Sequence, residues 1–254
     1  MTLACRCEDL AAGWPGNVLI ENLTIDAAFE NLNYALPIIG RTGRGKSTLL
    51  YALSGMAELK KGRIAWQFPA DSSPTSWSSE GRSFKSVEQL RRHRFGFLLQ
   101  DASMIPCFTI AENLTHMLRL RGISERIESR VKAAVESMLI ESERVDDFLC
   151  QYPIKLAGGQ RQRMALAIAI AHDPLVLFAD EPTASLDDKS GLEVLGVIRR
   201  WLNEGKGQRA FVFVTHRVET LHEGIGARQA LELHLQKQNS TSKVVATWRP
   251  VERD

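Results

Sequence analysis

Residues 40–47 read GRTGRGKS, that is Gly40-Arg41-Thr42-Gly43-Arg44-Gly45-Lys46-Ser47, and Thr48 follows. They fit the pattern G-x-x-x-x-G-K-[ST], in which glycines let backbone N–H groups point inward at phosphate oxygens. The lysine of this pattern reaches the β- and γ-phosphates, and the next hydroxyl binds Mg²⁺. The loop follows the apolar run 34–39 and precedes a segment with a helical pattern. It predicts a phosphate-binding loop between a strand and the positive N-terminal end of a helix.

Two carboxylates at the end of another apolar run complete the predicted phosphate site. Residues 175–181 read LVLFADE, a short buried strand that ends in Asp180 and Glu181. Asp180 would lie near the Mg²⁺ ion, and Glu181 would orient or deprotonate an attacking water. The alternative is that this pair only starts a helix before Pro182. The phosphate loop upstream favours the catalytic interpretation.

Apolar runs and helical patterns alternate along the rest of the chain. Runs of strand length occur at 18–25, 34–39, 95–99, 175–179, 211–214 and 231–235. One helical face repeats from Ile127 to Leu139 with Ser124 as its expected cap, and another ends at Gly205. The alternation predicts an α/β core with a largely parallel sheet. Residues 101–156 have mostly helical patterns and predict an inserted helical unit.

Two smaller features predict local structure. Pro37 stands inside the strand before the phosphate loop and removes a hydrogen-bond donor, which indicates an edge or a bulge there. The stretch 69–86 is rich in serine and contains two prolines, so a surface loop is expected.

Length and composition exclude several classes of protein. The 254 residues carry a formal net charge of +2, and 44% are hydrophobic and 24% charged. These values are unlike those of a collagen, a disordered acidic tail or a small disulfide scaffold. The near-neutral charge argues against a general electrostatic hold on nucleic acid or anionic lipid. No run of 18 apolar residues occurs, so no membrane-spanning helix is expected, and a secretory signal is not supported.

Several motifs that accompany the phosphate loop carry a family resemblance. Leu156-Ala157-Gly158-Gly159-Gln160 resembles the LSGGQ signature of ATP-binding-cassette ATPases, and it ends 20 residues before Asp180. The remaining motifs follow in the family's order: Trp14 at the place of the aromatic residue that stacks on adenine, Gln100 as the Q-loop glutamine, Asp187 in the D-loop and His216 as the switch histidine. Residues 95–114 and 177–187 resemble the branch that serves lipoprotein release, macrolide export and cell division.

The resemblance implies a fold and a domain organisation. The fold is α/β, a P-loop nucleoside triphosphatase with a RecA-like parallel core, an N-terminal antiparallel β part and an inserted helical subdomain. The chain is then one nucleotide-binding domain with no fused membrane part. Residues 1–100 and 158–254 would form its catalytic core, and residues 101–157 its helical subdomain.

The resemblance also implies an ATPase and a role for each motif residue. Glu181, His216 and Lys46 would act in catalysis, and Ser47, Gln100 and Asp180 would bind Mg²⁺. Residues 40–48, Trp14 and Gln100 would bind ATP. Across a head-to-tail dimer, the second nucleotide would be contacted by Ala157, Gly158, Gly159, Gln160 and Asp187.

Partners and location follow from the same resemblance. Two cassettes, identical or paralogous, would enclose two Mg-ATP, and separate membrane-spanning permease subunits would dock on the helical subdomain. The chain would lie in the cytoplasm, peripheral on the inner face of the cell membrane. Nucleic acid is not expected as a partner.

Four positions depart from the family pattern, and one of them is Arg44, which is larger than the usual small residue of the phosphate loop. Ala157 stands where the signature usually has serine, Ile168 where arginine is common, and Arg217 where an acidic residue is common. A lost hydrogen bond from a signature serine to the γ-phosphate would cost about 1.5–3 kcal/mol. These departures leave open a regulatory nucleotide-binding module with low turnover. A soluble cassette ATPase of the iron–sulfur assembly type is a further alternative.

Overall fold

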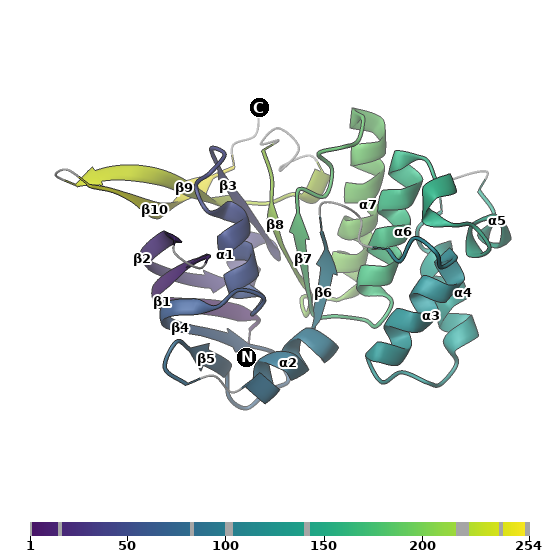
Figure 1. The fold of residues 1–254 in the computed structure, drawn as a ribbon, viewed down its shortest axis with the longest axis horizontal. Helices are drawn as coiled ribbons and strands as arrows, with labels where there is room; N and C mark the ends of the chain where they lie inside the picture. The colour runs from purple at the N-terminus through teal and green to yellow at the C-terminus, as the bar shows by residue number, and fades with distance from the viewer. Residues whose placement is uncertain are drawn as a thin grey trace.

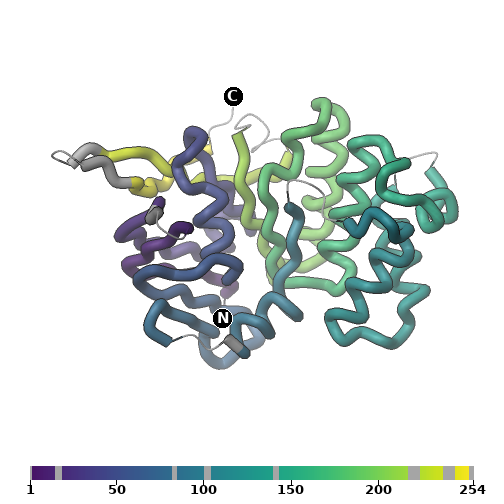
Figure 2. The backbone as a smooth tube through the Cα atoms, in the orientation of Figure 1, coloured from purple at the N-terminus to yellow at the C-terminus, as the bar shows by residue number. Residues whose placement is uncertain are grey.

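The computed structural model describes residues 2–14, 17–81, 84–99, 104–139, 143–216, 224–238 and 241–251. Two β-sheets lie side by side, and helices cover the second sheet and extend away from it (Figure 1). The backbone crosses from the first sheet to the second twice, passes into a group of helices at residues 110–149, and then returns through the second sheet to a long terminal hairpin (Figure 2). The arrangement is the predicted α/β class with an antiparallel N-terminal part.

A six-stranded sheet forms the centre of the molecule. Its order is β10-β9-β3-β8-β7-β6, and all neighbours pair in parallel except the edge pair β9–β10. Its strands are β3 (Ala35–Gly40), β6 (Phe95–Leu98), β7 (Val176–Asp180), β8 (Ala210–Val214), β9 (Gln229–Gln238) and β10 (Thr241–Pro250). Because the carboxyl ends of parallel strands share one edge, the residues that follow β3, β7 and β8 meet there.

A four-stranded antiparallel sheet packs beside the central one. Its order is β2-β1-β4-β5. Its strands are β1 (Ala4–Trp14), β2 (Asn17–Ala28), β4 (Leu59–Gln67) and β5 (Thr75–Ser78). Helix α1 (Lys46–Leu53) contributes its apolar residues to the core that the two sheets share, and α2 (Phe84–His93) leads from β5 towards β6.

Side chains of the central sheet alternate between two separate cores, as the period of two in a strand requires. Ile38 and Phe178 point into the core that contains α1 and the four-stranded sheet. Ile39 and Leu177, their neighbours in sequence, point into the core that contains α6 (Gly158–Ile170) and α7 (Asp188–Glu204). Helices α1 and α6 therefore pack on opposite faces of one sheet (Figure 1).

A group of helices packs on α6 in the second core. It comprises α3 (Ile110–Leu120), α4 (Ile127–Glu136), α5 (Val145–Leu149) and a short 3₁₀ turn, η2 (Pro153–Lys155). Leu114 of α3, Val135 of α4 and Met164 of α6 are fully buried together. These helices fall inside the predicted insertion, and its proposed boundaries at 101 and 157 remain a prediction.

The predicted helix ends have different outcomes. Gly205 does end α7, and its N–H bonds to the carbonyls of Trp201 and Leu202. Ser124 as the cap of α4 was wrong, because α4 begins at Ile127 and its cap is Arg126. Arg126 has a left-handed φ of 51°, so helical backbone begins only with the next residue, beyond Ser124.

Two strand predictions need correction. Pro37 lies in a central strand, not at an edge. The carbonyls of Tyr34 and Ile38 accept hydrogen bonds from Phe211 N and Thr215 N, on the side of β8. Because backbone groups alternate in direction along a strand, the nitrogen of Pro37 is on the side of β9, where pairing begins only at Ile38. The missing N–H of Pro37 therefore falls just before that ladder. The stretch 69–86 is not one loop, because β5 and the start of α2 lie within it.

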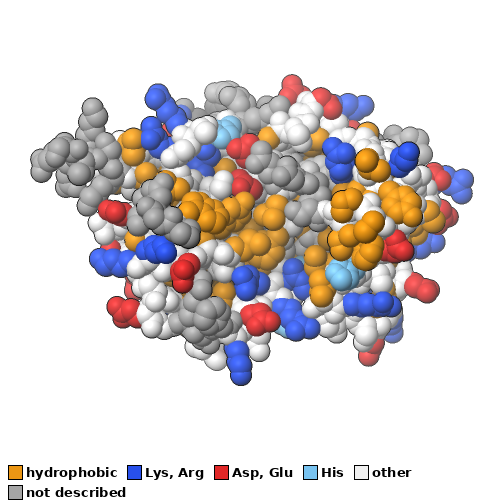
Figure 3. Space-filling view, viewed as in Figure 1, with side chains coloured by type: hydrophobic (Ala, Val, Ile, Leu, Met, Phe, Trp, Pro, Cys, Tyr) orange, Lys and Arg blue, Asp and Glu red, His pale blue; other side chains and the backbone are white. Residues whose placement is uncertain are grey.

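Within the described ranges, no helix combines the length and the apolar character that crossing a membrane requires. Basic and acidic side chains are interspersed over the face of the molecule seen in Figure 3, where apolar side chains gather near the middle and over the α3–α5 half.

Candidate active site

The phosphate loop joins β3 to α1 at the shared edge of the central sheet. Gly40 has a φ of +134°, and a Cβ there would lie 2.4 Å from the carbonyl oxygen of Leu233, so no other residue fits. Gly45 caps α1 with a φ of +81°. Since glycine has no side chain with which to cap, the first N–H groups of α1 are available to an anion. Thr48 is buried in the first turn of the helix.

Lys46 lies across this loop. Its Nζ donates to the carbonyl of Arg41 at 3.2 Å, and only 6% of the residue is exposed. Burial lowers the pKa of the Lys46 ammonium below its usual value, while the charges of Glu181 and Asp180 act in the opposite direction. The lysine and both predicted carboxylates are therefore in one electrostatic neighbourhood. Thr42 and Arg44 lie on the loop, exposed and half-buried respectively.

Asp180 sits at the end of β7 with both carboxylate oxygens in contact with hydroxyls of α1. Ser47 Oγ donates to Oδ1 at 3.2 Å, and Tyr51 OH donates to Oδ2 at 3.1 Å. Asp180 is 5% exposed. Burial and the Asp180 charge raise the pKa of Tyr51 to about 12, so its hydroxyl stays protonated. The sequence predicted Ser47 and Asp180 at one place, and the structure brings them together.

Glu181 and His216 face each other beyond the ends of β7 and β8. His216 Nε2 lies 2.8 Å from Glu181 Oε1. Glu181 adopts a left-handed φ of 50°, a conformation that is uncommon for non-glycine residues. A cavity of about 170 Å³ opens beside the pair and is lined by Glu181, Thr183, Ala184, Thr215 and His216. It has room for water beside a carboxylate base and an imidazole.

Trp14 is the exposed aromatic at the tip of β1, with 53% of its surface open to solvent. Its ring meets that of Tyr51 edge-on, with centroids 6.4 Å apart. An exposed indole next to the phosphate-loop helix can stack on a base. Its role in base recognition remains a prediction.

The signature segment starts α6 on the far face of the central sheet. Ala157 is the N-cap residue, and its N–H donates to Gln160 Oε1 at 3.2 Å. Alanine has no side chain that can bond the first N–H groups, which Gly158 and Gly159 leave uncovered. Ile168 is buried in the same helix.

Two contacts that the sequence did not predict hold α6 in place. Gln162 Nε2 donates to the carbonyl of Pro182 at 2.9 Å, which ties α6 to the loop after Glu181. Buried Arg163 pairs with Glu143, each nitrogen–oxygen distance being 2.8 Å. Tyr51 of α1, which bonds Asp180, was also not predicted. Its spacing of four from Ser47 on a predicted helix could have suggested that the two share a face.

Two further predicted residues, Asp187 and Gln100, have no contact with this cluster that the described residues show. Asp187 is exposed and caps α7 by accepting a hydrogen bond from Ser190 N at 3.0 Å; this bond lowers the pKa of the carboxyl. Gln100, predicted to contact Mg²⁺ and nucleotide, lies outside the described residues, as does Arg217.

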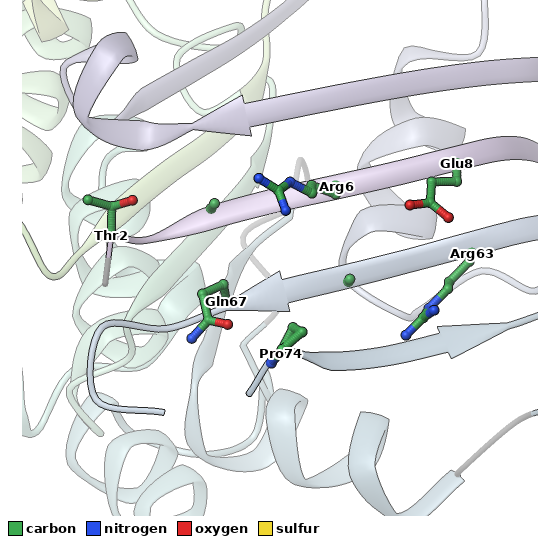
Figure 4. Close-up of a pocket in the computed structure, with 8 residues that line it drawn as sticks. Thr2, Arg6, Glu8, Arg63, Gln67 and Pro74 are labelled. Atoms are coloured by element: carbon green, nitrogen blue, oxygen red, sulfur yellow. The ribbon is translucent and has the colours of Figure 1, made fainter. Parts of the chain in front are cut away.

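A separate cavity of about 480 Å³ lies over β1 and β4 and is lined by Thr2, Ala4, Arg6, Glu8, Arg63, Ala65, Gln67 and Pro74 (Figure 4). Its basic side chains already have partners, because Arg6 bonds Asp26 at 3.2 Å and Arg63 bonds Ser76 at 2.8 Å. None of the phosphate-loop residues lines it.

The donor set around Asp180 fits Mg²⁺. This ion prefers hard oxygen ligands and is commonly held by one or two protein groups together with substrate phosphates. A serine hydroxyl and a carboxylate 3.2 Å apart, directly below an anion-binding loop, supply that set.

Known proteins resemble this chain along most of its length. The ABC transporter family matches residues 31–184. The ABC transporter ATP-binding protein YtrE of Bacillus subtilis is 36% identical over 197 residues, which cover 74% of this chain and 79% of the relative. The lipoprotein-releasing system ATP-binding protein LolD of Idiomarina loihiensis is 30% identical over 231 residues, or 87% and 95%.

A solved structure has the same fold. The dimeric ATP-binding cassette MJ0796, in a post-hydrolysis state bound to ADP and Pi, aligns with a TM-score of 0.73 at 21% identity, over 98% of this chain and 100% of its own. This match confirms the predicted fold class, and the LolD relative supports the resemblance to the lipoprotein-release branch. The family match spans more than half of the chain, and the relatives cover most of it. The chain therefore belongs to the ABC transporter family and is an ATPase of the ATP-binding-cassette type.

Proposed function

We propose that this chain pairs head to tail with a second cassette, its copy or a paralogue, around two Mg-ATP. Hydrolysis then drives separate membrane-spanning subunits. In this arrangement each nucleotide lies between the phosphate loop of one chain and the signature segment of the other.

One observation carries the proposal. The phosphate loop starts α1 on one face of the central sheet, and the signature starts α6 on the other. One chain cannot wrap both helix ends around a single γ-phosphate with the sheet between them. A second chain turned head to tail brings its signature to the first chain's nucleotide. The cassette MJ0796, which has the same fold, is dimeric, and this supports the pairing of two such chains.

The chain's own residues then divide the chemistry. Lys46 and the N–H groups of residues 43–48 bind the β- and γ-phosphates, and Ser47 and Asp180 hold Mg²⁺. Magnesium, when bound, neutralises charge that develops on the phosphoryl oxygens. Glu181 accepts a proton from the attacking water. His216 Nε2 carries a hydrogen towards Glu181, because an ionised carboxylate can only accept, and this hydrogen can be redirected to the γ-phosphate.

The membrane part of the proposal follows from the relatives. They are transporter ATP-binding proteins, and one is part of a lipoprotein-releasing system. We infer that the chain works in the cytoplasm, on the inner face of the membrane, with α3–α5 towards the partner. Binding that favours the closed dimer and hydrolysis that removes this preference would move the partner between two states.

The test is hydrolysis of Mg-ATP by the purified chain, alone and in complex with its membrane partner. Wild type is expected to turn over ATP, and Lys46→Ala and Glu181→Gln are expected to be inactive. Glu181→Gln should also form an ATP-dependent dimer in light scattering. Equal rates in all three proteins would overturn the enzymatic role.

A second candidate is a low-turnover regulatory module, which the missing hydroxyl at Ala157 favours. It predicts ATP-dependent dimers that persist for many minutes with little phosphate release. Rapid steady-state release from wild-type dimers would exclude it.

A further inference from the structure

Tyr51 contacts the predicted magnesium site at a position that none of the motifs includes. Its hydroxyl donates to Asp180 Oδ2 at 3.1 Å, while Ser47 Oγ donates to Oδ1 at 3.2 Å. Each oxygen of one buried carboxylate is thus held by a different hydroxyl of the same helix. The orientation of a carboxylate bound at both oxygens is more restricted than that of one bound at a single oxygen.

The supports of this contact are rigid. Ser47 and Tyr51 are four residues apart on α1, so both side chains lie on one face of the helix. Asp180 is the last residue of β7, a strand buried along its whole length. Two regular elements therefore fix the donor and the acceptor. A tyrosine also spans a long distance with only two side-chain torsions, so little entropy is lost in holding its hydroxyl there.

The tyrosine ring has a second contact. Trp14 meets it edge-on at 74°, with 6.4 Å between centroids. Tyr51 thus contacts both the exposed aromatic residue and the carboxylate that is predicted to bind Mg²⁺.

We propose that Tyr51 is a positioning residue for Asp180, and that its hydroxyl sets how strongly Mg²⁺ tightens nucleotide binding to this chain. The inference rests on the proposed function, because it needs Ser47 and Asp180 to hold Mg²⁺. When the Ser47 oxygen turns its lone pairs to the ion, the bond from Tyr51 still fixes the second oxygen of Asp180. Without the tyrosine hydroxyl, the carboxylate gains freedom to rotate and the ion loses a fixed partner.

The experiment measures the dissociation constant of a non-hydrolysable ATP analogue by calorimetry, once with Mg²⁺ and once with EDTA. The ratio of the two constants reports the magnesium contribution alone, because changes in folding or base stacking affect both. Tyr51→Phe removes one oxygen atom and keeps the ring against Trp14. Tyr152→Phe is the matched control, since it also removes one tyrosine hydroxyl. Tyr152 precedes η2, is 45% exposed and lies outside the site.

In Tyr51→Phe, the ratio is expected to shrink about tenfold, as is typical when a group that orients a metal ligand is lost. The constant in EDTA should stay at the wild-type value, and Tyr152→Phe should match wild type throughout. In hydrolysis assays, Tyr51→Phe should need more Mg²⁺ for half-maximal rate, and high Mg²⁺ should restore the maximal rate.

The other outcomes overturn the inference in distinguishable ways. A wild-type ratio in Tyr51→Phe shows that the hydroxyl has no part in magnesium binding, while the proposed function stands. A changed constant in EDTA with an unchanged ratio assigns the hydroxyl a purely structural role. If Mg²⁺ does not tighten binding even in wild type, and no hydrolysis occurs, the proposed function fails together with the inference.

Discussion

On one face of the central sheet, α1 begins at Gly45 beside a buried lysine and a carboxylate that is bound at both oxygens. On the other face, α6 follows its cap residue Ala157, and its Arg163 pairs internally with Glu143. Both helices start at residues that have no capping side chain. By contrast, Thr109 caps α3 and Asp187 caps α7 with side-chain oxygens.

In the proposed dimer, the two faces would supply unequal parts of one site. A lysine, a hydroxyl and a carboxylate converge on the α1 face, so this face is expected to bind a nucleotide without a second chain. The start of α6 offers backbone N–H groups and a helix end, which would add to a phosphate already bound by the other chain. We therefore expect α1-face variants to lose binding and α6-face variants to lose only what needs the second chain.

Lys46→Ala breaks the α1 face and should have the largest effect. Removing the buried cation takes away the main positive charge opposite the phosphates, so nucleotide affinity and hydrolysis should both fall roughly a thousandfold. Calorimetry and phosphate release check the two quantities. Retained nucleotide affinity in this variant would mean that the phosphates bind elsewhere.

Gly158→Asp tests the α6 face alone. A Cβ at Gly158 meets Leu186 Cδ2 at an ordinary 3.9 Å, whereas one at Gly159 would meet Ser190 Oγ at 3.0 Å, so the first position tolerates a side chain. The added carboxylate would face the partner's γ-phosphate, and hydrolysis should fall about a hundredfold. Nucleotide affinity of the isolated chain should remain that of wild type. A joint loss of affinity would place both helix ends in one chain's site.

His172→Gln probes how α6 is joined to the sheet. His172 Nε2 donates to the carbonyl of Phe95 at 3.1 Å, and burial, followed by the charge of Arg121, lowers the pKa of this imidazole to about 3. At pH values between about 3 and the ordinary pKa of 6.5, His172 binds a proton in the unfolded chain but not in the folded chain. Stability therefore falls as pH falls through this window, by about 2 kcal/mol at pH 5.

Urea unfolding at pH 7 and pH 5 measures this contribution. The difference between the two pH values should be about 2 kcal/mol smaller in His172→Gln than in wild type. Equal differences in both proteins would assign the acid sensitivity to other groups.

Ala157→Ser should have the smallest effect, and its sign is favourable. The hydroxyl can cap α6 and raise the free energy of unfolding by about 1 kcal/mol. In the closed dimer it can also donate to the γ-phosphate, so hydrolysis should rise about tenfold. Thermal melts and steady-state rates separate the two gains. Added stability with an unchanged rate would argue that this position does not reach the partner's nucleotide.

Local patterns predicted most of the fold because they have local causes. The run 175–181 had to be a buried strand that ends in two carboxylates, and it is β7 followed by Glu181. The glycine spacing of 40–45 corresponds to positive φ angles at Gly40, Gly43 and Gly45. The end of α7 at Gly205 likewise depends on neighbouring residues only.

What escaped prediction depends on partners distant in the chain. Pro37 is tolerated in a central strand because of where pairing with β9 begins. The start of α4 was also misplaced, since Arg126, not Ser124, precedes its first residue, and Val131 and Val135 of α4 pack in a core shared with other helices. Tyr51 bonds Asp180, 129 residues away in sequence. Gln162 of α6 likewise bonds Pro182, which follows β7.

The most direct test of the account mixes two inactive variants, Lys46→Ala and Gly158→Asp, and measures Mg-ATP hydrolysis. In a mixed head-to-tail dimer, the intact phosphate loop of one chain meets the intact signature of the other. If two chains share each site, the equimolar mixture should regain about a quarter of the wild-type rate, since half of the dimers are mixed and each mixed dimer has one whole site out of two. A mixture as inactive as either variant alone, while wild type is active, would contradict a site shared between two chains.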